Sequence, residues 1–476
     1  MALVLALIRS GILPLAPWDW WRAARAWWHC RASLAFLLEL AAARFPQRRA
    51  LHDEEGSLTF AQLHSQCLEL AAGLRARGVG AGQPVALLCR NHRGFVLGLL
   101  ALSRLGADAL PLGSDLPESV LLTILQRQKV ANLLHDGERT LELPGVRLLL
   151  LTEKGPAQDL PRLRRAGQLV VLTSGSTGVA KGIRRRPRLH QLLPIVAGLL
   201  QGLPLRRHRP FILAIPLHHG YGLAALALAL ALAAPLYLRR RYEVAGLLSD
   251  AAQDRPGLLI SVPTLLLRWL NSEPRASAPA AIITGSAPLE AGLCARLLRH
   301  CGPILYNLYG SSEAGVVALA GPERLAQSPG CVGRPLPGNQ VQLDPAGRIR
   351  VSGPLVLVEE TGDLGRWDEH GNLHVLGRAD SMIVCGGENV YPHELEEALL
   401  KHPGVREVAV LAVPDAEFGQ RLVAAVVADQ EADFLAWLRG RLERHKLPRE
   451  LRRLAAIPRN ALGKVDRPAL RQIFEA

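Results

Sequence analysis

Short apolar runs alternate with helical patterns along most of this 476-residue chain. The runs include PVALLC, FILAIPL, LLISVP, AAIITG and PILYNLY, and most of them stop at a polar loop that contains glycine. Strands that alternate with helices predict a mostly parallel sheet with helices on its faces. In open parallel sheets, ligands bind in the loops at the carboxyl ends of the strands. We therefore expect an α/β fold whose functional residues lie in the loops that follow these runs.

The pattern changes after residue 340 and again near residue 380. VQLDPAGRIRVSG and WDEHGNLHVLG contain the turn residues of hairpins, which predicts a small β subdomain. From Asp380 onward, about a hundred residues of mixed helical and strand pattern are enough for an independent domain. We expect a Trp/Arg-rich N-terminal segment at 1–32, a large multi-subdomain domain with mostly parallel sheets at 33–379, and a small mobile α+β domain at 380–476.

The charge and the cysteines limit the class of protein. A net charge of +14 suits an anionic partner such as a nucleotide, coenzyme A, a phospholipid surface or nucleic acid. The basic residues are spread along the chain without a zinc-finger, helix-turn-helix or aromatic-studded strand pattern, so we expect no nucleic-acid binding. The 7 cysteines are odd in number and include no C-x-x-C pair, which predicts a reduced, cytoplasmic protein without structural zinc.

Two apolar stretches resemble membrane segments at first reading. Residues 1–8, MALVLALI, have no basic region before them and are followed by Arg9, which fits neither a signal peptide nor a spanning helix. Gly220 to Leu238 is uncharged and long enough to cross a bilayer. Its Leu/Ala repetition and the interior Pro235 favour a buried core helix instead.

Tryptophan and arginine are concentrated near the N-terminus, at Trp18, Trp20, Trp21, Trp27 and Trp28 and at Arg9, Arg22, Arg25 and Arg31. Such a composition suits a helix in the membrane interface, where indole rings lie at the level of the lipid headgroups. A helical cap packed on the large domain is the alternative. Periodicity does not distinguish a lipid surface from a protein surface, so both interpretations stay open.

The stretch LVVLTSGSTGVAKG, from Leu169 to Gly182, is an apolar strand followed by a loop of hydroxyls and glycines. Gly175 and Gly178 let backbone amides approach an oxyanion closely, and Lys181 adds positive charge. The side-chain donors are Thr173, Ser174, Ser176 and Thr177. The stretch predicts a phosphate-binding loop, although it does not match the Walker pattern.

This loop resembles the phosphate loop of the adenylate-forming superfamily, which includes acyl-CoA synthetases, luciferases and nonribosomal adenylation domains. Further stretches resemble the family's motifs in the expected order: IPLHHGYG, IITGSAPL, NLYGSSEAG, ETGDLG, GRAD, CGGENVYPHE and PRNALGKVDR. The resemblance runs over nearly the whole chain from about residue 33 and looks closest to bacterial fatty-acyl-CoA ligases. It implies ATP, Mg²⁺ and coenzyme A as a co-substrate.

The resemblance also implies which residues bind the nucleotide. Asn307 would meet the amino edge of adenine, and Tyr309 would stack on its ring. Glu313 would hold Mg²⁺, for which a carboxylate and water are suitable ligands. Asp363 would accept both ribose hydroxyls, and Arg378 would lie near ribose or phosphate. The expected nucleotide contacts are Thr173, Ser174, Gly175, Ser176, Thr177, Gly178, Lys181, Gly285, Ser286, Ala287, Pro288, Asn307, Tyr309, Gly310, Ser312, Asp363 and Arg378.

Catalytic roles follow from the same resemblance for Lys464, His219 and Thr173. His219 would lie beside the reacting carboxylate, and Lys464 would reach the carboxylate and the α-phosphate from a mobile loop of the small domain. Asp380 would be the hinge about which the small domain rotates after adenylation. The rotation would withdraw Lys464 and bring Gly386 and Gly387 to the pantetheine path.

The chain departs from the family pattern in three places. His218 stands where an aromatic residue is usual, and Ser312 replaces a threonine but keeps the hydroxyl. The segment between Glu313 and Asp363 is shorter than usual. A lost surface loop and a damaged nucleotide site are both compatible with that shortening.

These residues together predict an AMP-forming acyl-CoA synthetase. We expect it to activate a carboxylic acid, in particular a medium- or long-chain fatty acid, through an acyl-adenylate to a CoA thioester. One alternative is a ligase that uses an aromatic acid or loads the phosphopantetheine arm of a carrier protein. Another is a non-catalytic relative with a degenerate site. We expect a cytoplasmic protein, with peripheral contact to the inner face of the membrane through its N-terminal segment as a further hypothesis.

Overall fold

The computed structural model describes residues 16–475 with short gaps. The residues outside the description are 115, 117, 157–159, 174–180, 186–188, 207, 273–277, 312, 380–382, 386–387, 391, 416–418, 440, 443–445, 461–464 and 476. Only the backbone is described at 173, 181–185, 189–192, 384–385, 388–389 and 419.

The largest sheet has nine strands in the order β15-β14-β13-β12-β11-β9-β10-β1-β2. Its strands are β1 Arg49–Asp53, β2 Gly56–Thr59, β9 Phe211–Ala214, β10 Leu236–Tyr237, β11 Leu258–Ser261, β12 Ala281–Thr284, β13 Leu305–Ser311, β14 Gly315–Ala320 and β15 Arg334–Pro335. The pairs from β13 through β12, β11, β9 and β10 to β1 are parallel, whereas β2, β14 and β15 are antiparallel to their neighbours. The parallel centre brings the ends of β9, β11, β12 and β13 to one edge.

The second sheet has six strands in the order β6-β5-β3-β4-β7-β8. Its strands are β3 Pro84–Leu88, β4 Asp108–Leu112, β5 Asn132–His135, β6 Arg147–Leu150, β7 Leu169–Thr173 and β8 Lys181–Arg185. All its pairs are parallel except β7 with β8. Two mostly parallel sheets joined by helices confirm the predicted α/β class.

Local sequence signals begin and end the helices between these strands. Thr59 and Gln62 form a reciprocal capping box at the start of α4 Phe60–Ala76. His92 accepts a hydrogen bond from Gly94 N at the start of α5 Arg93–Leu105, and Gly106 ends that helix in the left-handed conformation with φ 69°. The remaining helices of the large body are α2 Pro17–Cys30, α3 Leu34–Arg44, α6 Glu118–Gln128, α7 Leu189–Gly202, α8 Gly220–Ala231, α9 Val244–Asp250, α10 Pro263–Asn271, α11 Ala291–Cys301 and α12 Pro322–Gln327.

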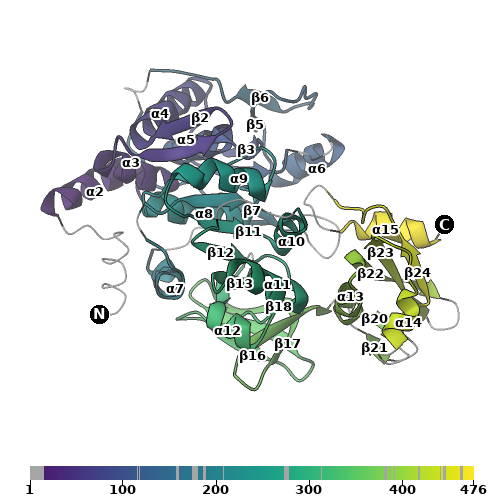
Figure 1. Cartoon of the computed structure of the whole chain (residues 1–476). Helices are drawn as coiled ribbons and strands as arrows, with labels where there is room; N and C mark the ends of the chain where they lie inside the picture. Colours follow the sequence, from purple (N-terminus) through teal and green to yellow (C-terminus); the bar gives the residue numbers. More distant parts are fainter. Residues whose placement is uncertain are drawn as a thin grey trace.

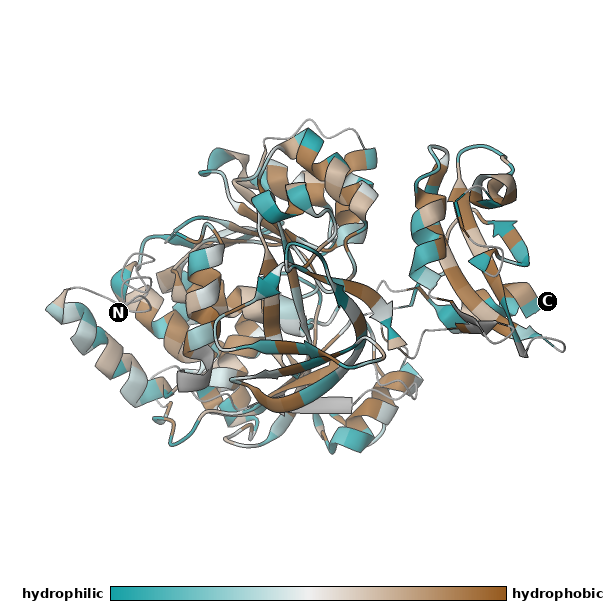
Figure 2. Ribbon diagram, turned by 90° about the horizontal axis from the view of Figure 1, so that it is seen from below, coloured by the Kyte–Doolittle hydropathy of each residue, from teal (hydrophilic) through white to brown (hydrophobic). Residues whose placement is uncertain are grey.

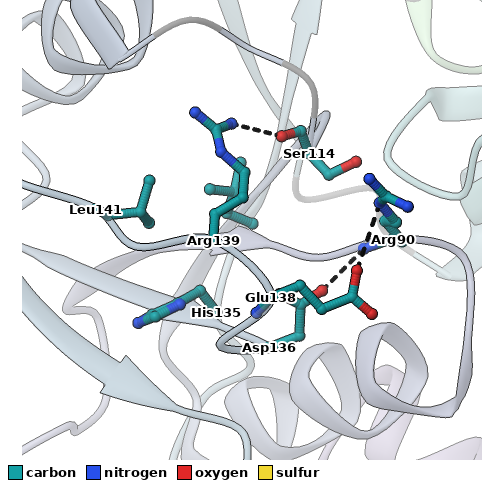
Figure 3. A pocket seen from close by; sticks show the side chains of 8 residues that line it. Arg90, Ser114, His135, Asp136, Glu138, Arg139 and Leu141 are labelled. Atoms are coloured by element: carbon teal, nitrogen blue, oxygen red, sulfur yellow. Dashed lines mark hydrogen bonds and ion pairs between the residues drawn. The ribbon is translucent and has the colours of Figure 1, made fainter.

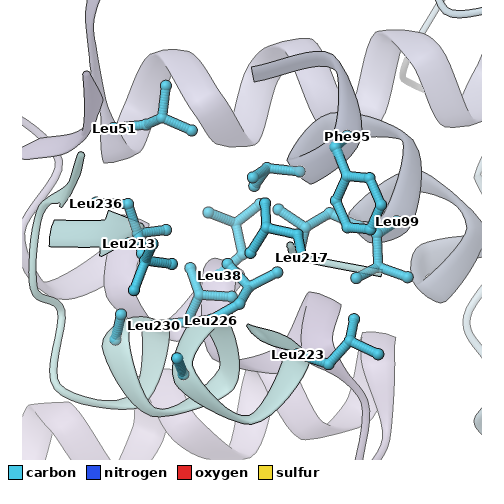
Figure 4. Packing of buried hydrophobic residues seen from close by; sticks show 14 of the residues in the cluster. Leu38, Leu51, Phe95, Leu99, Leu213, Leu217, Leu223, Leu226, Leu230 and Leu236 are labelled. Carbon is cyan, nitrogen blue, oxygen red and sulfur yellow. The ribbon is translucent and has the colours of Figure 1, made fainter. Parts of the chain in front are cut away.

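Helices α3, α4, α5 and α8 share one hydrophobic core that continues between the two sheets. Leu38 of α3, Phe95 of α5 and Leu226 of α8 are buried in this core beside Leu213 of β9 (Figure 4). A separate core on the other face of the nine-stranded sheet contains side chains of α9, α10 and α11, including Leu247, Leu266 and Leu297. Helices therefore cover both faces of this sheet (Figure 1).

The uncharged run that begins at Gly220 forms helix α8 and strand β10. Within α8, Leu223, Leu226 and Leu230 are buried in the core between the sheets. The predicted buried core helix is therefore confirmed. Within the described part of the chain, no helix combines the length and apolar character that crossing a bilayer would require.

A four-stranded antiparallel sheet follows, in the order β16-β17-β18-β19. It consists of β16 Gln340–Leu343, β17 Arg348–Gly353, β18 Val356–Trp367 and β19 Leu373–Arg378, and it matches the predicted β subdomain. Its core includes Ile349 and Val351 together with Tyr309 and Val317 of the nine-stranded sheet. This shared core fixes β18 and β19 against the end of β13.

The C-terminal block has cores of its own on both faces of a three-stranded sheet. Its elements are β20 Ile383–Cys385, β21 Glu388–Val390, α13 Pro392–Leu400, β22 Val405–Asp415, β23 Gly419–Ala428, α14 Phe434–Arg439, β24 Glu450–Arg453 and α15 Arg467–Glu475. Helices α13 and α14 supply side chains to one core, and α15 supplies them to the other. The block stands beside the larger body (Figures 1 and 2). The predicted hinge Asp380 lies outside the described residues.

Candidate active site

The end of β13 carries two of the predicted adenine residues on the buried face of the strand. Asn307 and Tyr309 are both buried, one pleat apart. The Asn307 amide Nδ2 donates a hydrogen bond of 2.9 Å to the carbonyl of Cys331, which fixes the orientation of the amide. The Asn307 Oδ1 atom is buried and has no partner among the described residues. It is an acceptor suited to an exocyclic amino group of a ligand.

Tyr309 connects β13 to the antiparallel subdomain. Its phenol donates a hydrogen bond of 2.7 Å to Asp363 Oδ2 in β18. Burial and the Asp363 charge both raise the pKa of Tyr309, so the phenol remains a donor. Two predicted nucleotide residues that lie far apart in the sequence are thus in direct contact.

Arg378 completes this cluster from the neighbouring strand. Asp363 and Arg378 are register partners in the β18–β19 pair, and Arg378 Nη1 lies 3.6 Å from Asp363 Oδ1. The same nitrogen donates to the carbonyl of Thr361 at 2.9 Å. Gly362 lies between these groups with φ +73°, and a Cβ atom there would come within 2.9 Å of the Arg378 guanidinium. Only glycine fits that position without displacing Arg378.

The buried hydroxyl of Thr361 holds the Asp363 backbone in place. It donates to the carbonyl of Ile349 in β17 at 3.1 Å and accepts from Asp363 N at 3.1 Å. The hairpin between β17 and β18 is tight, since Gly353 pairs with Val356. The shortened segment therefore leaves the contacts of Asp363 with Tyr309 and Arg378 in place.

The predicted turn at 285–288 lies beside these residues. Thr284, the last residue of β12, is the register partner of Asn307. Gly285 is packed so closely that a Cβ atom would lie 3.0 Å from the carbonyl of Leu308. Ser286 has φ 65°, and residues 286–288 are exposed.

The loop after β13 carries the predicted metal ligand. Gly310 lies against the backbone of Gly315, where a Cβ atom would be 2.1 Å from the carbonyl oxygen. Ser311 donates to Glu359 at 3.1 Å and accepts from Ala314 N at 2.8 Å, which orders the loop. Glu313 is exposed. One exposed carboxylate fits Mg²⁺, because this ion keeps several waters and binds substrate phosphates for its other positions.

The phosphate loop is described only at its two ends. Thr173 ends β7, Lys181 begins β8, and the two are register partners in an antiparallel pair. The loop between them therefore connects paired strands. Ser174, Gly175, Ser176, Thr177 and Gly178 lie outside the described residues.

The two histidines of the IPLHHGYG stretch lie between β9 and α8. His219 is the N-cap residue of α8, and its ring centroid lies 4.1 Å from that of His218. Burial, with a smaller effect of His219, lowers the pKa of His218 to about 3. A Cβ atom at Gly113, just beyond β4, would lie 3.2 Å from His218 Nε2. His218 is thus a neutral flat ring in the narrow space between the two sheets.

Asn91 is a positioning residue that the sequence analysis missed. It is buried, its Nδ2 donates to the carbonyl of Ile215 at 2.6 Å, and its Oδ1 accepts from Leu217 N at 2.9 Å. One amide therefore clamps the backbone just before His218 from the other sheet. The sequence signal was a lone asparagine after the strand-like run PVALLC.

The remaining predicted residues of the small domain, Gly386, Gly387 and Lys464, lie outside the described residues. The base of the Lys464 loop is described. Arg459 and Val465 form an isolated antiparallel bridge, and Arg459 Nη2 pairs with Glu407 Oε2 at 2.7 Å.

A small pocket elsewhere contains none of the predicted site residues. It lies near the ends of β3 and β5, where Arg139 donates to the carbonyl of Ser114 at 2.6 Å and Arg90 pairs with Glu138 at 3.5 Å (Figure 3).

Beside this pocket, Cys89, His92 and Asp136 each have one potential metal-ligand atom within 4.8 Å of those of the other two. Their geometry is accounted for by hydrogen bonds, since His92 Nδ1 accepts from Gly94 N and its Nε2 faces Cys89 and Asp136. The pocket is a structural, ion-paired region.

Two consecutive family matches define the class of this protein. Residues 38–358 match the AMP-binding enzyme family, and residues 394–464 match the AMP-binding enzyme C-terminal domain. The chain belongs to the AMP-binding enzyme family, as the resemblance to adenylate-forming enzymes predicted.

Particular relatives narrow the class. A 2-succinylbenzoate–CoA ligase of Bacillus cereus is 30% identical over 469 residues, which cover 90% of this chain and 96% of the relative. The solved o-succinylbenzoate CoA synthetase of Bacillus subtilis, in complex with its acyl-adenylate intermediate, is 26% identical with a TM-score of 0.80 and covers 91% of this chain and 97% of its own. ATP-bound MatB from Rhodopseudomonas palustris is 26% identical with a TM-score of 0.79, over 93% and 99%.

These matches confirm an AMP-forming acid–CoA ligase that uses ATP, Mg²⁺ and coenzyme A. The relatives do not support the predicted closeness to fatty-acyl-CoA ligases, or a place in fatty-acid and lipid metabolism, because the relative that is 30% identical and the Bacillus subtilis structure are both named for 2-succinylbenzoate. The roles of the individual site residues stay predictions.

Proposed function

We propose that this chain activates an aromatic carboxylic acid with MgATP and transfers the acyl group to coenzyme A. ATP binding is supported mainly by one observation, the contact cluster of Tyr309, Asp363 and Arg378 at the end of the parallel sheet. The acid class is supported by relatives named for 2-succinylbenzoate that align with 90% of the chain.

The cluster suits the adenosine part of ATP. Asp363 has two carboxylate oxygens, of which one accepts from Tyr309 and the other faces Arg378. Both oxygens retain lone pairs that ribose hydroxyls can use. Asn307 Oδ1 would accept the adenine amino group, and the exposed turn at 286–288 would lie along the ring.

Adenylation requires a carboxylate to approach a polyanion, so charge compensation and positioning are the main tasks. Mg²⁺ at Glu313 would supply charge neutralisation on the phosphates. We propose that the loop donors from Thr173 to Gly178, with Lys181 and Lys464, bind the phosphate oxygens. The antiparallel pairing of Thr173 with Lys181 supports this, because it brings both ends of the loop together.

An aromatic acid also agrees with the chemistry at His218. The position usually holds an aromatic side chain, and a neutral imidazole is still a flat ring. With its pKa lowered to about 3, His218 is uncharged at neutral pH and can contact an aromatic ring as a flat neutral side chain. His219 beside it is proposed to contact the reacting carboxylate.

The thioester step is proposed to follow rotation of the small domain about Asp380, which would bring Gly386 and Gly387 to the pantetheine arm. Separate cores on both faces of the β22–β23 pair support movement of this block as a unit.

The change Lys464→Ala should abolish pyrophosphate release yet leave thiolysis of supplied acyl-adenylate largely intact. Lys401→Ala, an exposed lysine of the same domain, is the matched control. Equal loss of both half-reactions in Lys464→Ala would contradict the division of labour.

We propose a cytoplasmic location, which is supported by the free thiols of Cys30, Cys67, Cys89, Cys294, Cys301 and Cys331. Peripheral contact with the inner face of the membrane, through the N-terminal segment, is part of the same proposal. It is supported by the position of the tryptophans in α2.

A pyrophosphate-release assay with a panel of acids tests the proposed function. The panel contains 2-succinylbenzoate, benzoate and fatty acids of several lengths, each with coenzyme A, with a phosphopantetheinylated carrier protein or with neither. We expect release with the aromatic acids and thioester formation with coenzyme A. Preference for a fatty acid or for the carrier protein would replace the proposed substrate, and no acid-dependent release at all would indicate a non-catalytic relative.

A further inference from the structure

Helix α2 packs on the large body through small and polar side chains. Asp19, Ala26 and Cys30 are spaced by seven and four residues and therefore share one face of the helix. Ala26 and Cys30 are buried, and Asp19 pairs with Arg44 of α3 at 3.2 Å. Cys30 Sγ donates to Glu39 of α3 at 3.1 Å. This face is the one turned to the protein.

The opposite face of α2 presents its tryptophans to solvent. The exposed fractions are 65% for Trp18, 54% for Trp20, 65% for Trp21, 41% for Trp27 and 54% for Trp28. An ordinary surface helix turns its apolar face inward. Here the orientation is inverted for Trp18, Trp20, Trp21 and Trp28, whereas the Trp27 ring packs edge-on against Phe36 of α3 with 5.9 Å between the ring centroids. This tryptophan face (Trp18, Trp20, Trp21 and Trp28) is an exposed apolar patch of the kind that marks an interaction site. The cap interpretation of the segment does not account for these four tryptophans, because the contacts to the body are made by the other face and by Trp27.

A basic segment from a distant part of the chain lies at the C-terminal end of this face. Leu163 N donates to the carbonyl of His29 at 2.9 Å, and Arg31 Nε donates to the carbonyl of Leu163 at 3.2 Å. Arg162 lies over the Trp28 ring, 4.4 Å from its centroid. Arg162 thereby extends the tryptophan face. Arg164 and Arg165 follow it closely in the chain and are exposed as well, and the three form the arginine strip (Arg162, Arg164 and Arg165). Among the described residues, no acidic side chain forms an ion pair with this strip.

We propose that the tryptophan face and the arginine strip together dock on the surface of an anionic phospholipid bilayer. Indole rings partition to the headgroup level, where the ring is in an apolar layer and the N–H reaches polar groups. The arginines at the rim match the phosphates of anionic lipids. The inference rests on the proposed peripheral location and is independent of the ligase reaction.

Charge and shape favour a lipid over a second copy of the chain. The tryptophan face belongs to a single convex helix at the outer edge of the body (Figure 1), and a flat, deformable lipid surface can follow such a shape. Each copy of the chain carries a net charge of +14, which an anionic surface attracts and a second copy repels.

Vesicle flotation of the full chain tests the proposal. The probes are vesicles of phosphatidylcholine alone and equimolar mixtures with phosphatidylglycerol. We expect the wild type to float with the anionic vesicles, and the triple change W18Q/W20Q/W21Q to lower the bound fraction at least about tenfold.

The triple change R162E/R164E/R165E should weaken binding to the anionic vesicles by about fivefold per residue, most strongly at low salt. Trp367→Gln, at an exposed tryptophan of β18, is the matched control and should bind as the wild type does.

The outcomes separate the possible failures. If the tryptophan variant floats as the wild type does and the arginine variant does not float, the peripheral location stands. The proposal that the tryptophan face contacts the lipid would then be wrong. No flotation of the wild type would overturn both. A wild-type dimer that the tryptophan variant splits in sedimentation velocity would assign the face to a second copy. Ligase activity without vesicles should be unchanged in every variant, so a failed lipid test says nothing against the reaction.

Discussion

Tyr309 at the end of β13 donates a hydrogen bond of 2.7 Å to Asp363 of β18, which joins a parallel and an antiparallel sheet at the point where the nucleotide is expected. Asp363 is also 3.6 Å from Arg378 Nη1. The carboxylate is therefore held from two sides.

The change Tyr309→Phe should raise the KM for ATP about tenfold, because a hydrogen bond to a charged group contributes about 1.5 kcal/mol. The ring remains available for stacking, so kcat should change less. Steady-state kinetics with varied ATP measure both quantities. Tyr306→Phe is the control, since Tyr306 is on the opposite face of the same strand. An unchanged KM in Tyr309→Phe would exclude a role for the phenol in orienting Asp363.

Gly362→Ala should displace Arg378, because the new Cβ atom would lie 2.9 Å from the guanidinium. The change also adds backbone strain of about 1 kcal/mol at φ +73°. Gly371→Ala has similar strain at φ +70°, but the atom nearest to its new Cβ, Nη2 of Arg334, is 3.7 Å away. Both variants should lose similar stability in urea unfolding, and only Gly362→Ala should lose ATP affinity in calorimetry. Equal ATP affinities would mean that Arg378 is not part of the nucleotide site.

Asn91→Ala should weaken the binding of the acid more than that of ATP. It removes both hydrogen bonds that clamp the backbone at Ile215 and Leu217, at a stability cost of about 2 kcal/mol. Asn339→Ala is the control, since buried Asn339 also makes two backbone hydrogen bonds, to Val316 and Val317. Both variants should be destabilised, but only Asn91→Ala should raise the KM for the acid. A rise of the same size in Asn339→Ala would attribute the effect to general destabilisation.

His218 should make stability depend on pH below neutrality. Its folded pKa of about 3 lies below the ordinary value of 6.5, so below pH 6.5 the unfolded chain takes up a proton that the folded chain does not. The folded state therefore loses stability as the pH falls through this window, by up to about 1.4 kcal/mol per pH unit. His218→Phe keeps a flat ring without a titrating group and should flatten this dependence in urea unfolding. His370→Phe, at an exposed histidine, should leave it unchanged.

Much of this arrangement could be predicted from the sequence because its signals are local. Alternating strand and helix patterns predicted the parallel sheets, and the motif residues Asn307, Tyr309, Asp363 and Arg378 do lie close together. The role of Asn91 could not be predicted, since its partners are more than 120 residues away and are backbone atoms. Nor could periodicity tell which face of α2 is buried. That depends on the fit of Ala26 and Cys30 against α3, and tryptophan would ordinarily be assigned to the buried side.

The central claim is that the acid becomes an acyl-adenylate before it meets coenzyme A, and oxygen-isotope transfer tests it most directly. 2-Succinylbenzoate labelled with oxygen-18 in its carboxylates is incubated with the enzyme, MgATP and coenzyme A, and the nucleotide product is analysed by mass spectrometry. The predicted result is AMP that carries one labelled oxygen, because the thiol attacks the acyl carbon and the bridging oxygen leaves with the phosphate. Unlabelled AMP, or ADP as the product, would contradict it.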